Sequence, residues 1–374
     1  MNIALLSGDS RSLVNFRSDL IIKLLDSGNK VYCLAPDWDD DLINLACSYG
    51  AIPINVGSGL TKVISGRNSI SFIKLFTFFR KYKLDAIFSF FVYPSIVAPV
   101  IAHFAGIKKI ICMIEGRGSE LTLKNSSYIE RLRFFSVKTF LQISFNFSKL
   151  IFVLNNQDKI FFENEVGINP SKIKFIDGIG INLQKWAYSE ILDNRDQVCF
   201  VFSGRFLKSK GVIEFVEAAR ILKLKYPSVN FFLLGDFYKK KDSISKSYIA
   251  NAVDDGVIFA PGYVNVDTYL QKKSVFVLPS YYNEGLPRSI MEAMAVGRPI
   301  ITCKIQGCDR TVIEDYNGIY IKSHDVDGLV NAMKRFISTP ALINYYGKNS
   351  RSLAVERFDV NVINSVIINE INEL

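Results

Sequence analysis

One segment in the second half of the sequence, residues 280–300, limits the fold of this chain more than any other. An apolar run at 275–278 precedes it and another, at 299–302, ends it, and both are typical of buried strands. Between them, Pro287 suits the first position of a helix and Gly297 suits its end. The segment therefore predicts a strand, a turn, a helix and a second strand, which is the repeating unit of a parallel α/β sheet.

The turn in this segment predicts a site for a nucleotide-sugar. Backbone amides around Leu286, Arg288 and Ser289 form a predicted helix N-terminus, which can receive phosphate oxygens. Glu284 lies just before the helix and Glu292 lies in its second turn. Their carboxylates can accept hydrogen bonds from the hydroxyls of a sugar. The alternative is an ordinary strand–helix–strand unit with solvated glutamates.

A basic turn at residues 202–211 accompanies the acidic one. It follows an apolar run at 198–202 and precedes a helical pattern at 212–224. Gly204 allows a close backbone turn, while Arg205 and Lys210 lie on either side and can both reach one pyrophosphate, arginine as a fork and lysine as a point charge. Alone, such a loop is usually just solvated.

Together the two motifs resemble those of the family 4 glycosyltransferases, which are retaining enzymes of the GT-B fold. The resemblance covers essentially the whole chain. It implies that Arg205 and Lys210 hold the donor diphosphate and stabilise it as it leaves, that Glu292 binds the ribose, and that Glu284 binds the transferred sugar. The donor-binding residues that it implies are Gly8, Gly204, Arg205, Lys210, Gly285, Leu286, Pro287, Arg288 and Glu292.

The chain is long enough, at 374 residues, for two domains. Strand-like runs alternate with helical patterns in both halves, including one continuous helix expected at about 12–26. This alternation predicts an α/β protein with two doubly wound, Rossmann-like domains facing a cleft. We place an N-terminal, acceptor- and membrane-side domain at 1–187 and a C-terminal, donor-binding domain at 188–356. The resemblance implies that the last helix, within 357–374, crosses back to the first domain.

Two turns of the first half are further candidates. The glycine of the Ser7–Gly8–Asp9–Ser10 turn approaches the donor phosphates in the resembled family, whereas a plain helix-capping turn is an equal alternative. Residues 114–120 resemble the Glu-Gly-x-Gly-Ser run of bacterial transferases that extend undecaprenyl-diphosphate-linked sugars, notably an N-acetylgalactosaminyltransferase. Glu115 stands where many family members have a histidine, so we carry over no histidine role. The acceptor-side candidates are Glu115, Gly116, Arg117 and Gly118.

Several cofactor classes lack support in the sequence. Asp37 and Asp39 have the DxD spacing of some metal-binding transferases, but their place before a predicted helix favours capping, and the resembled fold uses no such metal. Six scattered cysteines include no CxxC pair, which argues against zinc or a disulfide framework. No GxGxxG motif supports a dinucleotide. We therefore expect neither a metal nor a cofactor.

The positive charge of the chain is concentrated in one quarter. Residues 60–150 contain 14 lysines and arginines against 4 acidic residues, whereas the remainder contains 31 against 32. This quarter is also rich in aromatic residues, and basic helices with large apolar faces suit an anionic membrane surface. The alternatives are solvated basic faces, or nucleic acid, for which no known motif is present. Candidate contacts are Arg80, Lys81, Lys83, Arg131, Arg133 and Lys138, with Phe79, Phe134 and Phe135 if these face outward.

Two further features bear on location. The N-terminus lacks the basic start and cleavage site of a signal peptide. The apolar region 86–106 approaches the length of a membrane span, but Pro94 and Pro99 interrupt it, so a buried strand followed by a buried helix is the better interpretation. We expect a cytoplasmic protein peripherally associated with the inner face of the plasma membrane.

These observations lead to one functional expectation. We expect a retaining glycosyltransferase that moves N-acetylgalactosamine or N-acetylglucosamine from a UDP-sugar to an undecaprenyl-diphosphate-linked saccharide. The product would be a surface glycan, such as the O-antigen of lipopolysaccharide, a capsule or a glycoprotein glycan. The alternatives are a GT-B sugar-nucleotide epimerase and a catalytically silent membrane scaffold of a glycan assembly complex.

Overall fold

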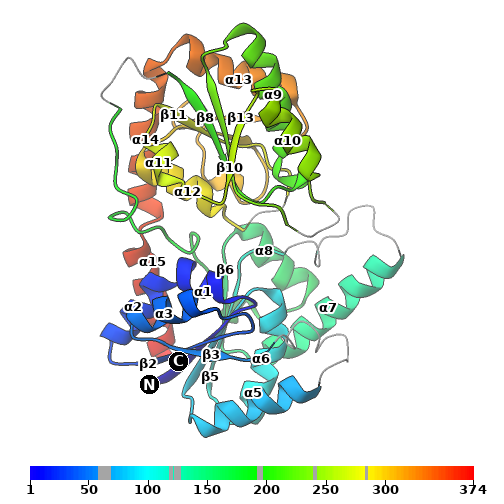
Figure 1. Cartoon of the computed structure of the whole chain (residues 1–374). Helices are drawn as coiled ribbons and strands as arrows, with labels where there is room; N and C mark the ends of the chain where they lie inside the picture. The colour runs from blue at the N-terminus through cyan, green and yellow to red at the C-terminus, as the bar shows by residue number, and fades with distance from the viewer. Residues whose placement is uncertain (58–68, 118–120, 122–127, 192–196, 239–241, 283–284) are drawn as a thin grey trace. The chain divides into compact units, whose positions relative to one another are not determined.

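The chain forms two compact units in the computed structural model, which describes residues 1–57, 69–117, 121, 128–191, 197–238, 242–282 and 285–374. Unit 1 comprises residues 1–179 and 360–374, and unit 2 comprises residues 180–359. Each unit is a parallel sheet with helices packed around it (Figure 1). The units meet in sequence at 179/180, eight residues before the boundary that we placed at 187/188.

Unit 1 is built on a seven-stranded sheet with strand order β3-β2-β1-β4-β5-β6-β7, in which all pairs are parallel. Every residue of β4 is buried, as expected where helices cover both faces of a sheet. The strands are β1 (Asn2–Leu6), β2 (Lys30–Ala35), β3 (Ile52–Asn55), β4 (Ala86–Phe90), β5 (Lys109–Ile114), β6 (Leu150–Val153) and β7 (Ile173–Phe175).

The helices of unit 1 connect these strands and pack with them around buried apolar residues. They are α1 (Ser10–Phe16), α2 (Ser18–Asp26), α3 (Asp40–Ser48), α5 (Ser69–Lys81), α6 (Val92–Phe104), α7 (Tyr128–Phe147), α8 (Asn156–Ile160), the short helices η1 (Phe161–Glu165) and η2 (Pro170–Lys172), and α15 (Val360–Glu373).

The single helix expected at 12–26 is wrong in one respect, because Arg17 divides it into α1 and α2. Arg17 has φ −122° and ψ 6°, outside the helical region, and it is at once the last cap of α1 and the first cap of α2. Its side chain is buried. The amphipathic pattern of the sequence does not reveal this break, since the cause is a tertiary contact of Arg17.

The apolar region 86–106 forms β4 and the buried helix α6, as the prolines predicted. Phe91 joins the two elements with φ +68°, an uncommon backbone conformation for a residue other than glycine. Among the described residues, no helix combines the length and the apolar character needed to cross a membrane.

Unit 2 repeats the same architecture with six parallel strands in the order β10-β9-β8-β11-β12-β13. The strands are β8 (Cys199–Ser203), β9 (Asn230–Leu234), β10 (Phe259–Gly262), β11 (Ser274–Leu278), β12 (Ile300–Cys303) and β13 (Gly318–Ile321). The helices are η3 (Lys208–Lys210), α9 (Val212–Lys225), α10 (Lys246–Asp254), α11 (Asp267–Leu270), α12 (Arg288–Val296), η4 (Cys308–Arg310), α13 (Val326–Ser338) and α14 (Ala341–Arg357).

In both sheets the strand order reverses at one place, between β1 and β4 in unit 1 and between β8 and β11 in unit 2. Ligands of doubly wound folds bind outside the carboxyl ends of the strands at this switch point. The fold therefore directs attention to the turns that follow these four strands.

The C-terminal helix α15 returns to unit 1, as the family resemblance implied, and packs against α2. Ile367, which is 1% exposed, contributes to the packing. The Lys23 ammonium donates to the Asn361 carbonyl (2.9 Å) and the Ser365 hydroxyl (2.6 Å). Apolar burial and these bonds together attach the end of the chain to its first domain.

Candidate active site

The basic and acidic turns predicted from the sequence lie next to each other in unit 2. Strands β8 and β11 are direct neighbours, with Phe276 paired to Val201. The Tyr281 amide donates to the Ser209 carbonyl (2.9 Å), so the segment after β11 is bonded to the segment after β8. Gly211 permits the approach, because a Cβ there would lie 2.3 Å from the Pro279 carbonyl oxygen.

Aromatic rings accompany the two cations of the basic turn. The Arg205 side chain is exposed, with its guanidinium carbon 5.1 Å from the centre of the Tyr238 ring. The Lys210 ammonium is 5.6 Å from the centre of the Tyr282 ring. Such cation–π contacts favour particular positions of long side chains while their charged ends stay accessible.

A third turn, after β9, completes this arrangement, and the sequence analysis missed it. Gly235 has φ +137°, and a Cβ there would lie 1.9 Å from the Gly204 carbonyl oxygen, so only glycine fits. The Asp242 carboxylate accepts from the Ser209 amide (3.2 Å) and also from the Ser209 hydroxyl. The available signal was Leu-Gly-Asp at the end of an apolar run, which has the form of a strand-ending turn.

Behind the segment after β11 lies a polar cluster that was also missed. The His324 ring lies against the Tyr281 ring with centroids 3.9 Å apart, and its Nδ1 is 3.0 Å from Glu214 Oε1. His324 has φ +63°. Burial raises the pKa of Tyr281 to about 12, with the charges of Glu214 and Asp242 adding to the effect. These contacts brace Tyr281, which is one residue from the ring next to Lys210.

Helix α12 begins at Arg288, one residue later than predicted. Pro287 is the N-cap instead of the first helical residue (φ −67°, ψ 112°), and among the described residues no side-chain hydrogen bond caps the helix start. Gly285, Leu286 and Pro287 are buried in the turn. Gly297 ends the helix with φ +86°, as predicted. An N-terminus without a side-chain cap suits an anion. Glu284, a predicted site residue, lies outside the described residues.

Glu292 lies one turn into α12, paired with Arg288. Arg288 Nε is 2.9 Å from Glu292 Oε1, and the two side chains are 17% and 15% exposed. Burial raises the pKa of Glu292 above its ordinary value, although the charges of Arg288 and Lys185 act in the opposite direction. The carboxylate is thus held at the helix start that carries the predicted diphosphate site.

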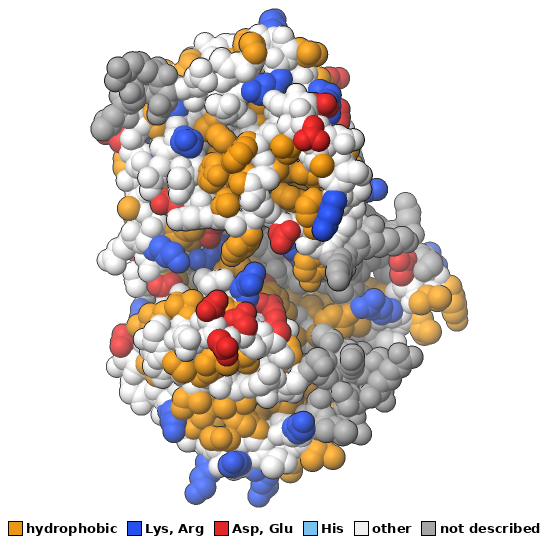
Figure 2. All heavy atoms as spheres, viewed as in Figure 1, with side chains coloured by type: hydrophobic (Ala, Val, Ile, Leu, Met, Phe, Trp, Pro, Cys, Tyr) orange, Lys and Arg blue, Asp and Glu red, His pale blue; other side chains and the backbone are white. Residues whose placement is uncertain are grey.

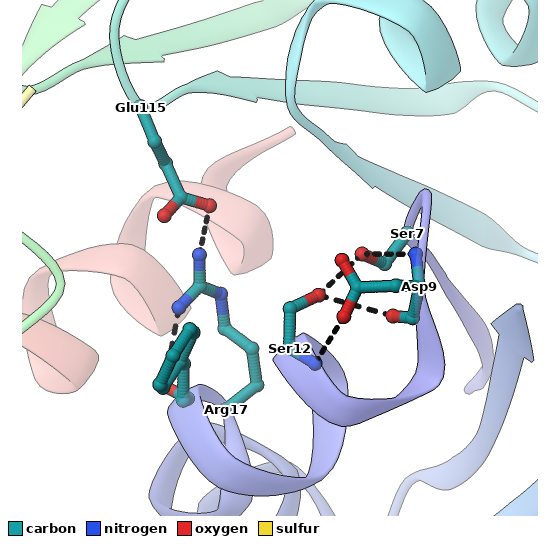
Figure 3. A network of polar contacts seen from close by, with 6 residues as sticks. Ser7, Asp9, Ser12, Arg17 and Glu115 are labelled. Atoms are coloured by element: carbon teal, nitrogen blue, oxygen red, sulfur yellow. Dashed lines mark hydrogen bonds and ion pairs between the residues drawn. The ribbon is translucent and has the colours of Figure 1, made fainter. Parts of the chain in front are cut away.

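The turn at Gly8 in unit 1 differs electrostatically from the start of α12. Asp9 is the N-cap of α1 and accepts from the Ser12 amide (2.7 Å) (Figure 3). Asp37 accepts from the Ser10 amide (2.7 Å). Burial, with the charge of Asp37 adding to it, raises the pKa of Asp9. Two backbone amides at this helix start therefore already donate hydrogen bonds to carboxylates. The donor-binding role of Gly8 stays a prediction.

The two aspartates of the DxD motif bond to the starts of two different helices. Asp39 caps α3 by accepting from the Leu42 amide (2.8 Å), which confirms the capping interpretation for this residue. Asp37 instead bonds Ser10 at the start of α1. The two carboxylates therefore serve different helices.

The acceptor-side candidates follow β5 in unit 1. Glu115 pairs with Arg17, which the sequence analysis did not single out, and Gly116 has φ +121° (Figure 3). Arg117 Nε donates to Asp158 Oδ1 (2.8 Å), and Asp158 is fully buried. Gly118 lies outside the described residues. Glu115 and Arg117 are thus in separate ion pairs at the carboxyl edge of the sheet.

Helix α7 has apolar residues on two faces. The face toward the core includes Phe134, which is 8% exposed. The outward face carries Ile129, Leu132, Phe135, Phe140 and Ile143, which are 45–76% exposed, and Arg131 and Arg133 are exposed on the same helix. Hydrophobic and basic side chains are visible over α7 at the right of Figure 2. Of the three phenylalanines proposed for membrane contact, Phe135 faces outward, whereas Phe79 and Phe134 pack in the core.

Comparison with known proteins shows which family and which solved structures the chain resembles. Residues 185–353 match the family described as "Glycosyl transferases group 1". All of the chain is covered by HepE from Anabaena crystallised with UDP and glucose (16% identity, 100% of that chain, TM-score 0.78). It is likewise covered by a sucrose-phosphate synthase from Thermosynechococcus elongatus (18% identity, 98% of that chain, TM-score 0.79).

Two characterised relatives are similar along most of the sequence. The N,N'-diacetylbacillosaminyl-diphospho-undecaprenol alpha-1,3-N-acetylgalactosaminyltransferase of Campylobacter jejuni is 26% identical over an alignment of 378 positions. The alignment covers 97% of this chain and 96% of that protein. The UDP-Gal:alpha-D-GlcNAc-diphosphoundecaprenol alpha-1,3-galactosyltransferase of Escherichia coli is 27% identical over 304 residues, 78% and 76% respectively. These similarities confirm the predicted resemblance to the group 1 glycosyltransferases, and the similar solved structures show that the chain has the GT-B fold.

We predict that Arg205→Ala and Lys210→Ala each reduce the rate of sugar transfer by roughly 10²–10³ while the protein stays folded. The reason is that each removes a preorganised positive charge from the leaving diphosphate. Steady-state kinetics with a UDP-sugar measures the effect. Lys225→Ala is the matched control, because Lys225 also lies over a tyrosine ring (Tyr226, 5.9 Å) but at the far end of α9. Near-normal turnover in either folded variant would remove the diphosphate assignment.

We predict that Glu292→Gln weakens UDP binding roughly tenfold to a hundredfold, the typical effect of losing a hydrogen bond to a charged group. The thermal stability should be unchanged or higher, because the raised pKa of Glu292 means that its ionised form lowers stability at neutral pH. Calorimetry with UDP and a thermal melt measure both quantities, with the exposed Glu356→Gln as control. Wild-type UDP affinity in Glu292→Gln would show that the ribose role is wrong.

Proposed function

We propose that this glycosyltransferase moves N-acetylgalactosamine or N-acetylglucosamine from a UDP-sugar to an undecaprenyl-diphosphate-linked saccharide, with retention of the anomeric configuration. The observation that carries the donor assignment is the placement of Arg205, Lys210 and the uncapped start of α12 together at the switch point of one sheet. The acceptor class rests on the names of the two relatives that are similar along most of the chain.

In this mechanism the bond between the anomeric carbon and the β-phosphate oxygen breaks as the acceptor hydroxyl oxygen bonds to that carbon on the same face. The proton of the hydroxyl passes to the departing phosphate oxygen. Arg205, Lys210 and the amides at the start of α12 stabilise the negative charge that develops on the diphosphate. Glu292 binds the ribose, and Glu284 binds the transferred sugar.

The membrane side of the proposal rests on α7. An acceptor on a polyprenyl chain stays in the bilayer, so the enzyme must come to the surface. An exposed apolar face with arginines beside it is the arrangement of helices that lie in a membrane interface. We infer that unit 1 docks on the anionic inner face of the plasma membrane through this face of α7, in the pathway of a surface glycan.

A donor and acceptor panel tests the reaction. We expect the purified chain to transfer sugar from UDP-N-acetylgalactosamine or UDP-N-acetylglucosamine to an undecaprenyl-diphosphate-linked N-acetylhexosamine, and to give an α-linked product by NMR. Transfer should persist in EDTA, because Asp39 caps a helix and Asp37 bonds a backbone amide. Interconversion of UDP-sugars without an acceptor product would instead identify an epimerase, and UDP binding without turnover would identify a silent scaffold.

We predict that the wild-type protein sediments with anionic vesicles at low salt and is partly released at high salt. Each basic residue near such a surface contributes about 1 kcal/mol, and salt screens the attraction. Charge reversal to glutamate at Arg131, Arg133 and Lys138 should abolish sedimentation and reduce transfer to the lipid acceptor, with UDP affinity unchanged. Reversal of the exposed Lys272 and Lys322 in unit 2 is the control. Wild-type sedimentation of the α7 variant would mean that this helix is not the membrane face.

A further inference from the structure

A buried ion pair lies at the switch point of the unit 1 sheet. Arg17 comes from the break between α1 and α2 that follows β1, and Glu115 follows β5. The Arg17 guanidinium lies 4.7 Å from the centre of the Phe90 ring, at the end of β4. Its Nη2 donates to Glu115 Oε1, and the two side chains are 4% and 11% exposed (Figure 3). Three neighbouring strands thus contribute to one charged cluster at their carboxyl edge.

This cluster does not have the features of a stabilising core contact. Removing two charges from water is costly, and apolar replacements of buried ion pairs are often as stable or more stable. Arg17 Nε is buried and finds no hydrogen-bond partner among the described residues, which adds a further penalty. Arg17 also interrupts the helix that contains it. Contacts that cost stability in this way are expected at functional sites.

A neighbouring ion pair at the same edge, between Arg117 and Asp158, shows a carboxylate with both oxygens bonded. Both carboxylate oxygens of Asp158 are used, Oδ1 by Arg117 Nε (2.8 Å) and Oδ2 by Asn155 Nδ2 (2.9 Å). Glu115 differs, because only Oε1 is bonded, and the described residues offer no hydrogen bond to Oε2. Glu115 therefore has one carboxylate oxygen that no described residue bonds.

We propose that Arg17 is a positioning residue for acceptor recognition. It fixes Oε1 of Glu115, so that Oε2 faces a hydroxyl of the acceptor saccharide and accepts its hydrogen bond. Arg17 acts through Glu115 and does not contact the substrate. The position fits the carboxyl edge of the strands, where doubly wound folds bind ligands. This inference rests on the proposed function, because it assigns a saccharide to the acceptor site.

Apolar replacement separates a positioning role from a structural one. Arg17→Met leaves the Glu115 charge buried without its partner and should lower the unfolding temperature of unit 1 by roughly 5–15 °C. The double variant R17M/E115L removes both charges and should recover most of that loss. Its KM for the lipid-linked acceptor should nevertheless rise roughly tenfold to a hundredfold, with UDP affinity unchanged. R17K should retain part of the acceptor affinity.

The matched control is R220M/D255L, which removes an exposed ion pair (2.9 Å) between α9 and α10. It should change neither the KM for the lipid-linked acceptor nor the KM for the UDP-sugar. A folded R17M/E115L protein with the wild-type KM for acceptor would overturn this inference alone, because the pair would then be only structural. A wild-type protein that binds UDP but transfers sugar to no lipid-linked saccharide would overturn the proposed function, and this inference with it.

Discussion

The close packing of three backbone turns in unit 2 is the constraint on which the proposed donor site depends. A Cβ at Gly235 would lie 1.9 Å from the Gly204 carbonyl oxygen, and a Cβ at Gly211 would lie 2.3 Å from the Pro279 carbonyl oxygen. These two contacts bring the turns after β8, β9 and β11 into one layer. Arg205, Lys210 and the start of α12 come from the first and last of these turns, so their proximity follows from the absence of two side chains.

The start of α1 in unit 1 and the start of α12 in unit 2 have different electrostatic environments. In unit 1, Asp9 and Asp37 occupy amides at the start of α1, and a phosphate there would meet two carboxylates. In unit 2 the part of the chain that the structure describes provides no side-chain cap for α12, and the nearby Glu292 is paired with Arg288. The same fold therefore provides one helix start that repels anions and one that attracts them. Of the two, α12 is the better position for a diphosphate.

The sequence predicted the fold and the positions of the turns after β8 and β11 well, because both depend on local patterns. Buried parallel strands appear as continuous apolar runs, and Gly297 marks a helix end wherever the helix packs. The ion pair of Arg17 with Glu115 and the contact of His324 with Glu214 could not be predicted, since the partners are 98 and 110 positions apart in the sequence. The burial of Phe79 and Phe134 could not be predicted either. A helix with phenylalanines on all sides does not reveal which side packs against the core.

The charges of the two units suit the two kinds of group that a glycosyl transfer brings together. The leaving diphosphate carries negative charge, and unit 2 presents Arg205 and Lys210 beside an uncapped helix start. An acceptor hydroxyl is neutral and donates a hydrogen bond, and unit 1 presents Glu115, whose charge Arg17 balances while one oxygen stays available. A balanced ion pair can bind a hydroxyl without attracting the phosphates, whereas an unbalanced cation attracts them strongly. The electrostatic difference between the two sheet edges therefore favours donor binding in unit 2 and acceptor recognition in unit 1.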